Sequence, residues 1–288
     1  MSQSPARPRR SALYLPASNA KALAKARELP VDVVILDLED SVAPDGKLEA
    51  RELALAALHE GGFGRREVVV RANGLDTPWG ADDLAAIAVA GPDAVLVPKV
   101  SSAEDVLAYD QALVAAPVGT RLWIMVESCA LVLRIDAVAA LGASTRLSGM
   151  VMGINDFAKE MRAQLRPGRA PFLPILTATV CAARAHGLVV LDGVCNEFRD
   201  LDLFTAEAEQ GLEFGFDGKT LIHPAQVDPC NAVFSPGEAE LAWASAVVAA
   251  FDLPENHGKG AIKVDGKMVE LLHLEQARRV LAVAAAIS

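Results

Sequence analysis

Acidic side chains follow several short apolar runs of this sequence. One run leads into Asp37, Glu39 and Asp40, and two later runs lead into Glu127 and Asp156. Carboxylates that meet at one opening repel one another strongly unless they share a cation. Mg²⁺ suits such a place because it takes one or two carboxylates and completes its shell with water and substrate oxygens. We therefore predict a Mg²⁺ site with Glu127 and Asp156 as direct ligands, and Mn²⁺ as the alternative cation.

Helix capping is the alternative role for these acids. Asp is favoured at helix N-termini, so capping fits Asp156 best when that residue is taken alone. For the whole set, capping would have to hold independently at several strand ends. A shared cation explains the set with a single cause, and we favour it.

Arg71 ends a Glu-Val-Val-Val run. A guanidinium at the end of a buried strand needs an anionic partner. A structural ion pair with Asp37 or Glu39 would satisfy this need. The alternative, which we favour, is that Arg71 contacts a substrate carboxylate or stabilises a developing enolate oxygen.

Three further segments are expected to contact substrate. Gly153-Ile154-Asn155 precedes a helix, and the free N–H groups at a helix start can hold a carboxylate. Lys99 follows the fourth apolar run. Arg9 and Arg10 precede the first run, where they form either a solvated basic tail or a contact for a phosphate.

These residues need a scaffold, and eight apolar runs alternate with alanine-rich segments of helical character. Near-continuous Val, Ile and Leu runs are typical of parallel strands that are covered on both faces. The predicted strands are Ala12–Leu15, Val33–Leu38, Glu67–Arg71, Ala94–Pro98, Leu122–Val126, Met150–Met152, Leu188–Leu191 and Thr220–Ile222. The predicted helices are Ser18–Leu29, Leu48–His59, Asp82–Ala90, Ala103–Ala115, Ala130–Leu141, Ile175–His186 and Leu201–Gln210.

This alternation predicts an α/β fold, a (β/α)8 TIM barrel with a C-terminal helical lid segment. Polar residues at the C-terminal ends of the strands then face the active-site mouth. A doubly wound sheet is the alternative, but its Gly-rich first turn is replaced here by Pro16-Ala17-Ser18-Asn19. We expect a barrel domain over residues 1–252. A turn-rich linker and the lid occupy residues 253–288, with a helix from about Val269.

Composition narrows the classes of partner. The chain has 288 residues and a formal net charge of −10, from 27 Lys and Arg against 37 Asp and Glu. This acidic balance argues against binding to nucleic acid or to an anionic membrane. No apolar run approaches the roughly 18 residues that cross a bilayer. The four cysteines lack metal-site spacing, so we expect a cytoplasmic protein with reduced thiols.

Several segments resemble the family of the citrate lyase beta subunit and malyl-CoA lyase, within the HpcH/HpaI aldolase/citrate lyase superfamily. The resemblance runs in order along nearly the whole chain. Its segments are Arg10–Pro16, Leu36–Val42, Val70–Gly74, Val97–Val100, Gly153–Asp156, Asp217–Pro224 and Val264–Val269. It implies a Mg²⁺-dependent barrel enzyme that acts on CoA thioesters. Members cleave or form the carbon–carbon bond of a 3-hydroxyacyl-CoA such as malyl-CoA or citramalyl-CoA, with a 2-oxo acid as the second small molecule.

The resemblance also implies roles for individual residues. Glu127 and Asp156 bind the metal, Asp37 and Glu39 support the metal-bound waters, and Arg71 contacts the substrate. The C-terminal segment covers the active site of a neighbouring subunit in a homotrimer or homohexamer.

One position departs from the family pattern. Lyases of the family carry an Asp in a Met-Val-Asp segment of the lid, whereas this chain has Met268-Val269-Glu270. Glu270 keeps the charge and adds a methylene, so we count it with Arg71 and Asp37 as a catalytic residue. Alternatively, it marks a branch that hydrolyses malyl-CoA-like thioesters, or it is only an exposed Glu that starts a helix.

Four functions therefore compete. The leading hypothesis is a Mg²⁺-dependent CoA-ester lyase, and the second is a thioesterase on the same scaffold. The third is a citrate lyase beta subunit that acts on a citryl thioester within a complex and needs an acyl-carrier partner. The fourth, a noncatalytic ligand sensor, is disfavoured by the retained acids.

Overall fold

The computed structural model describes residues 7–287. The chain divides into two compact units, of which the first is Arg9–Phe234. The second contains the helices and the hairpin that follow Ser235. The expected boundary between residues 252 and 253 lies inside this second unit, at the C-terminal end of α11 (Glu238–Phe251).

Eight strands of the first unit form a closed parallel barrel. They are β1 (Ser11–Pro16), β2 (Val33–Asp37), β3 (Glu67–Arg71), β4 (Ala94–Val97), β5 (Arg121–Val126), β6 (Leu147–Met152), β7 (Val189–Asp192) and β8 (Gly218–Leu221). The strands pair in sequence order, and β1 closes the barrel against β8 with Leu13 opposite Leu221. The predicted TIM barrel and its eight predicted strands are confirmed, with small shifts at the strand ends.

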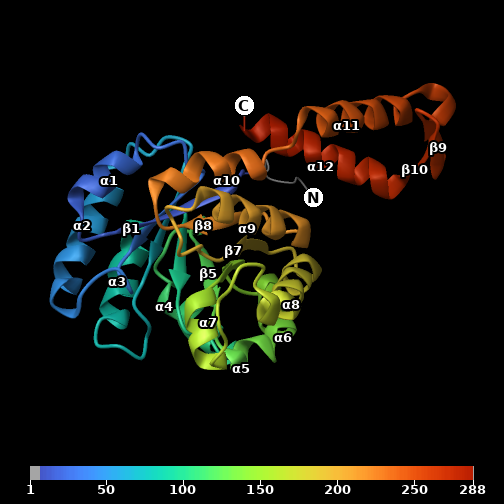
Figure 1. Ribbon diagram of the computed structural model, residues 1–288. Coiled ribbons are helices and arrows are strands. Elements are labelled where there is room, and N and C mark those ends of the chain that lie inside the picture. The colour runs from blue at the N-terminus through green and yellow to red at the C-terminus, as the bar shows by residue number, and fades with distance from the viewer. Residues whose placement is uncertain (1–6, 288) are drawn as a thin grey trace. The chain divides into compact units, whose positions relative to one another are not determined.

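Helices surround the barrel strands (Figure 1). They are α1 (Ala20–Ala26), α2 (Lys47–Glu60), α3 (Gly80–Ala90), α4 (Ala103–Ala112), α5 (Cys129–Val132), α6 (Ile135–Ala139), α7 (Ile154–Met161), α8 (Leu173–Ala185), α9 (Leu201–Phe214) and α10 (Val227–Val233). The helix predicted over 130–141 is interrupted at Leu133 and Arg134, and α6 restarts with Ile135 and Val138 buried in the core. Both α10 and α11 lie outside the predicted helices.

Apolar side chains fill the barrel and the layer between its strands and the helices. Successive strand residues point to opposite faces, so Ile35 and Val69 lie in the barrel interior while Leu36 and Val70 pack in the larger outer cluster. The same alternation makes Asp37 the last inward-facing residue of β2. Arg71 is its counterpart in β3, and the barrel therefore places both at its C-terminal mouth.

The second unit holds α11, an antiparallel hairpin and α12 (Leu271–Ile287). The hairpin pairs β9 (Ala261–Val264) with β10 (Lys267–Glu270). Its turn residues Asp265 and Gly266 have φ of 49° and 80°, as a two-residue type I′ turn requires. The helix expected from about Val269 is present as α12 and begins at Leu271, because Val269 and Glu270 belong to β10. Among the described residues, no helix is long and apolar enough to cross a membrane.

Candidate active site

The predicted residues lie on consecutive strands of the barrel. Asp37 and Arg71 end β2 and β3, Lys99 follows β4, Glu127 follows β5, and Asp156 lies in the first turn of α7 after β6. Because the strands are parallel, their C-terminal ends open at one mouth. The topology therefore brings these five side chains to the same end of the barrel.

Arg71 and Asp37 form a buried bidentate ion pair. Nε of Arg71 donates to Oδ1 of Asp37 at 2.6 Å, and Nη2 donates to Oδ2 at 2.7 Å. Although burial alone would raise it, the pKa of Asp37 is held below its usual value by the charge and hydrogen bonds of Arg71. The guanidinium also lies over the ring of Tyr14, 4.7 Å from its centroid. These contacts fix the orientation of the guanidinium.

The remaining nitrogen of Arg71 meets two further acids. Nη1 lies 2.8 Å from Oε2 of Glu39 and 3.3 Å from Oδ2 of Asp40. Among the described residues, no donor meets Oε2 of Glu39 with hydrogen-bond geometry, although this oxygen is buried. Burial raises the pKa of Glu39 to about 8 against the opposing charge of Arg71. The ion-pair alternative for Arg71 is thus present, because Nε, Nη1 and Nη2 all lie against carboxylate oxygens of Asp37, Glu39 or Asp40.

Glu127 is held by the backbone that follows β4. The N–H of Lys99 donates to Oε1 of Glu127 at 2.6 Å. Lys99 has a φ of 54°, a left-handed conformation that costs about 1 kcal/mol or more outside glycine. Burial raises the pKa of Glu127 to about 7 despite this hydrogen bond, and the charge of Asp156 adds to the rise. The two predicted metal ligands therefore interact electrostatically.

Gly153 leaves the space that the Glu127 side chain occupies. A Cβ at this position would lie 2.5 Å from both Cβ and Oε2 of Glu127. Any side chain here would push the carboxylate away. Gly153 is also the N-cap residue of α7. Its contribution is room for Glu127 and a start for the helix that carries Asp156.

The first turn of α7 supplies the other predicted contacts. Asp156 is half-buried and Asn155 is exposed. The Asn155 amide exchanges two hydrogen bonds with Asn196 in the loop after β7, at 3.1 and 2.8 Å. The side chain of Ile154 is buried in an apolar cluster with Phe157. The predicted substrate contact of Ile154 would therefore have to be made by its backbone N–H, since its side chain is buried.

A divalent cation fits the chemistry of this mouth. Burial raises the pKa of both Glu39 and Glu127, and no described donor meets Oε2 of Glu39 with hydrogen-bond geometry, although Nη1 of Arg71 lies 2.8 Å away. Such features are expected where a cation belongs among oxygen ligands. Among the described residues, no three or more His, Cys, Asp or Glu side chains are arranged so that they could hold a metal ion together. Glu127 and Asp156 suffice, because Mg²⁺ takes one or two carboxylates and fills its shell with water and substrate.

Of the predicted residues in the barrel unit, Arg10 is not brought to this mouth. Arg10 precedes β1, so it lies at the N-terminal end of the barrel, opposite the mouth. Its guanidinium pairs with Asp32 through contacts of 2.8 Å, and this ion pair takes the place of the expected phosphate contact. Glu270 ends β10 in the second unit, where its side chain is exposed.

A buried ionic network lies behind β7 and β8. Asp192 accepts from Arg169 at 2.7 Å and from Lys219 at 2.8 Å, and Lys219 also donates to Glu207 at 2.9 Å. Asp192 ends β7, but it faces the helices because its neighbour Leu191 points into the barrel. The position of Lys219 inside a short strand is the sequence signal for this network, since a buried ammonium needs acidic partners.

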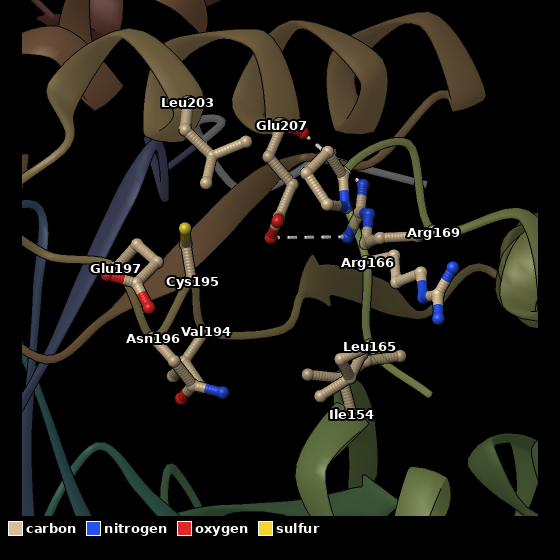
Figure 2. Close-up of a pocket in the computed structure, with 11 residues that line it drawn as sticks. Ile154, Leu165, Arg166, Arg169, Val194, Cys195, Asn196, Glu197, Leu203 and Glu207 are labelled. Atoms are coloured by element: carbon tan, nitrogen blue, oxygen red, sulfur yellow. Dashed lines mark hydrogen bonds and ion pairs between the residues drawn. The ribbon is translucent and has the colours of Figure 1, made fainter. Parts of the chain in front are cut away.

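A cavity of about 300 Å³ lies beside this network (Figure 2). Ile154 and Leu165 face Glu207 and Arg169 across it. Nη1 of Arg169 lies 3.8 Å from Oε1 of Glu207, so both charges are already paired within the network. The cavity therefore adjoins the first turn of α7 through Ile154 without adding an unpaired charge from these two residues.

Three kinds of similarity bear on this site. The family model for HpcH/HpaI aldolase/citrate lyase matches residues 10–224. A (3S)-malyl-CoA thioesterase from Cereibacter sphaeroides is 49% identical over 283 residues, covering 98% of this chain and 97% of that protein. An L-malyl-CoA/beta-methylmalyl-CoA lyase from the same species is 36% identical over 313 residues, covering 99% and 97%. A solved structure of protein CitE from Mycobacterium tuberculosis, in complex with magnesium, acetoacetate and coenzyme A, has a TM-score of 0.77. It is 28% identical, with 96% of this chain and 97% of that chain covered.

The matched segment contains the whole barrel and every residue that the structure places at the mouth. The thioesterase and lyase relatives extend the similarity through the second unit, because they cover nearly the full chain. Fold, charged mouth and sequence similarity agree, and the chain belongs to the HpcH/HpaI aldolase/citrate lyase family.

Proposed function

We propose that this protein hydrolyses the thioester of a short 3-hydroxyacyl-CoA of the malyl-CoA type, with Mg²⁺ held by Glu127 and Asp156. The observation that carries the proposal is the mouth, where two interacting carboxylates share one opening with Arg71. The choice of hydrolysis rests on similarity. The thioesterase relative is 49% identical to this chain, whereas the lyase relative is 36% identical.

Each group at the mouth has a task in this reaction. When bound, Mg²⁺ would act as a Lewis acid and template for the hydroxyl and carboxylate oxygens of the acyl group. Nη1 of Arg71 stabilises the negative charge that develops on the thioester oxygen. The N–H groups that start α7 hold the free carboxylate. Glu270 accepts a proton from the attacking water, the carbon–sulfur bond breaks, and the proton passes to the CoA sulfur.

Carbon–carbon cleavage is the second candidate, and the lyase relative favours it. Both reactions place the same ester at the mouth and need charge stabilisation at the thioester oxygen. They differ in the attacked bond. Hydrolysis adds water to the thioester carbon, whereas the lyase reaction takes a proton from the hydroxyl and leaves an enolate.

Product analysis separates the two reactions. Malyl-CoA incubated with the purified protein and Mg²⁺ is expected to give malate and CoA in equal amounts. Glyoxylate and acetyl-CoA would overturn hydrolysis in favour of the lyase. Turnover of the free CoA ester by this chain alone would also argue against a citrate lyase subunit that needs a carrier partner. Absence of both product pairs would reject the proposed function.

We also propose that the C-terminal segment, residues 253–288, is a lid on the active site of a neighbouring subunit in a homotrimer or homohexamer. Glu270 is exposed at the end of β10, and the adjacent Met268, Leu271 and Leu272 are also exposed. Apolar residues that surround a single carboxylate suit a surface that closes over a polar site.

Mixed oligomers test the lid. Glu270→Gln and Arg71→Ala, each inactive alone, are expected to regain about a quarter of wild-type activity after random subunit exchange in a symmetric oligomer. The gain arises because an intact barrel then meets an intact lid from another chain. Activity is measured after joint refolding, with each parent refolded alone as the control. A mixture as inactive as its parents would place Glu270 outside the neighbour's site.

A further inference from the structure

Lys47 is a buried lysine whose partners are uncharged. It is the first residue of α2 and is 6% exposed. Its ammonium group donates to the carbonyl oxygens of Leu38 at 2.8 Å and Glu39 at 2.7 Å, and to Oδ1 of Asn73 at 2.7 Å. A lysine ammonium has three protons to donate. All three therefore have an acceptor, and none of these acceptors is a carboxylate.

The three acceptors lie at the ends of two neighbouring strands. Leu38 and Glu39 form the turn after β2, and Asn73 follows β3 shortly after Arg71. The Glu39 carbonyl also accepts the N–H of Val42 at 3.0 Å. Lys47 therefore joins the turn that carries Glu39 to the segment that follows Arg71.

The contact with Asn73 continues into the next helix. Nδ2 of Asn73 donates to Oδ2 of Asp83 at 2.6 Å, and Oδ1 of Asp83 accepts from Arg51 at 3.1 Å. Both Lys47 and Arg51 belong to α2. The same helix thus contacts the mouth directly through Lys47, and the far end of the network through Arg51.

Docking of α2 alone does not explain a lysine at this position. Burial of an ammonium among neutral acceptors has a desolvation cost that an apolar side chain of similar length avoids. This desolvation cost is offset if the ammonium group has to hold its three acceptors in place for the active site to work. The Glu39 carbonyl is tied to Lys47 while its carboxylate lies 2.8 Å from Nη1 of Arg71, so the peptide orientation sets where that carboxylate points.

We propose that Lys47 is a positioning residue, which fixes the turns after β2 and β3 so that Glu39 and Arg71 hold the arrangement the reaction needs. The kinetic part of this inference rests on the proposed function. The structural and metal-binding parts do not, since they can be measured without turnover.

Lys47→Met removes the ammonium and keeps an unbranched side chain. We expect kcat for malyl-CoA to fall on the order of 30-fold with KM within about threefold, because misplacement of catalytic groups acts mainly on the chemical step. Mg²⁺ affinity, measured by calorimetry on the protein without substrate, is expected to fall roughly tenfold, as for other residues that support metal ligands. A crystal structure of the variant should show the Glu39 carboxylate displaced from Arg71.

Arg51→Met is the matched control. It lies one helical turn along α2 and breaks the ion pair with Asp83, so it destabilises the same network without touching Leu38 or Glu39. Its melting temperature is expected to fall because the buried Asp83 carboxylate loses its charged partner, while kcat and Mg²⁺ affinity stay within twofold of wild type. Equal kinetic losses in both variants would assign Lys47 a general structural role and overturn the inference.

The outcomes separate this inference from the proposed function. If the wild-type protein cleaves neither the thioester nor the carbon–carbon bond of malyl-CoA, the proposed function is rejected. The crystal structure of Lys47→Met then still decides the role of Lys47. If the wild type is active, and Lys47→Met keeps both the wild-type kcat and the wild-type position of the Glu39 carboxylate, the positioning role of Lys47 is rejected and the proposed function stands. If Lys47→Met does not fold, Lys47→Gln, which retains one donor group, is measured in the same three ways. An undisturbed Glu39 in that variant overturns the inference.

Discussion

Glu127→Gln is expected to lower kcat for the CoA ester by roughly 10³-fold or more and to remove its response to Mg²⁺. The amide keeps the size of the side chain and can still accept the Lys99 N–H that Glu127 accepts at 2.6 Å. What it loses is the negative charge that a hard cation requires. The measurement is steady-state turnover across a Mg²⁺ titration, with calorimetric Mg²⁺ binding beside it.

Asp156→Asn should lose both properties in the same way, because it removes the second anionic ligand. Glu160→Gln is the matched control: this carboxylate also lies on α7, but it accepts the N–H of Cys129 at 3.1 Å and is not one of the predicted metal ligands. It should keep wild-type turnover and Mg²⁺ binding. If Glu127→Gln retains its Mg²⁺ response, Glu127 is only an anchor for the Lys99 backbone.

Glu127→Gln should have a higher melting temperature than the wild type in metal-free buffer at pH 8. Burial raises the pKa of Glu127 from 4.5 to about 7. The folded state therefore binds the proton more tightly than the unfolded state, and stability falls as the pH rises from about 4.5 through 7. At pH 8 the buried carboxylate is charged at full cost, and the amide avoids that cost. Added Mg²⁺ should stabilise only the wild type.

The sequence predicted the barrel because its strands are continuous Val, Ile and Leu runs. Such runs occur where both faces of a strand are covered. The last inward residue of a strand must then face the mouth, as Asp37 and Arg71 do, and Glu127 and Asp156 follow the C-terminal ends of β5 and β6 at the same mouth. The position of these residues at the mouth was therefore predictable from the strand ends, while their roles in binding and catalysis stay predictions.

Three charged residues show what the strand pattern alone does not predict. Asp192 ends its strand one position out of phase and faces Arg169 and Lys219. Arg10 is at the wrong end of β1, where Asp32 neutralises it. Lys47 lies on a helix, and its partners are backbone carbonyls that carry no sequence signal of their own. The hairpin of β9 and β10 was also missed, although its Asp265-Gly266 turn carries a sequence signal that is typical of a two-residue hairpin loop.

Arg71→Lys is expected to lower kcat/KM for the CoA ester on the order of 10²-fold, because an ammonium cannot reproduce a planar fork of donors. In the structure Nε and Nη2 hold Asp37 at 2.6 and 2.7 Å, while Nη1 points to Glu39 at 2.8 Å. A lysine can neutralise Asp37 but cannot hold it and also present a donor to the substrate. The measurement is turnover well below the melting temperature of the variant, so that instability does not enter the rate.

Chemical rescue separates the substrate contact from the ion pair. Arg71→Ala leaves a space beside Asp37 and the ring of Tyr14, which now stacks on the guanidinium at 4.7 Å. Guanidinium ion at millimolar concentration should restore part of kcat, whereas methylammonium at the same concentration should not, since only the former is planar and stacks. Equal rescue by both cations would show that charge neutralisation of Asp37 is the whole role of Arg71. Wild-type kinetics in Arg71→Lys would lead to the same conclusion, and the oxyanion would then need another donor at the mouth.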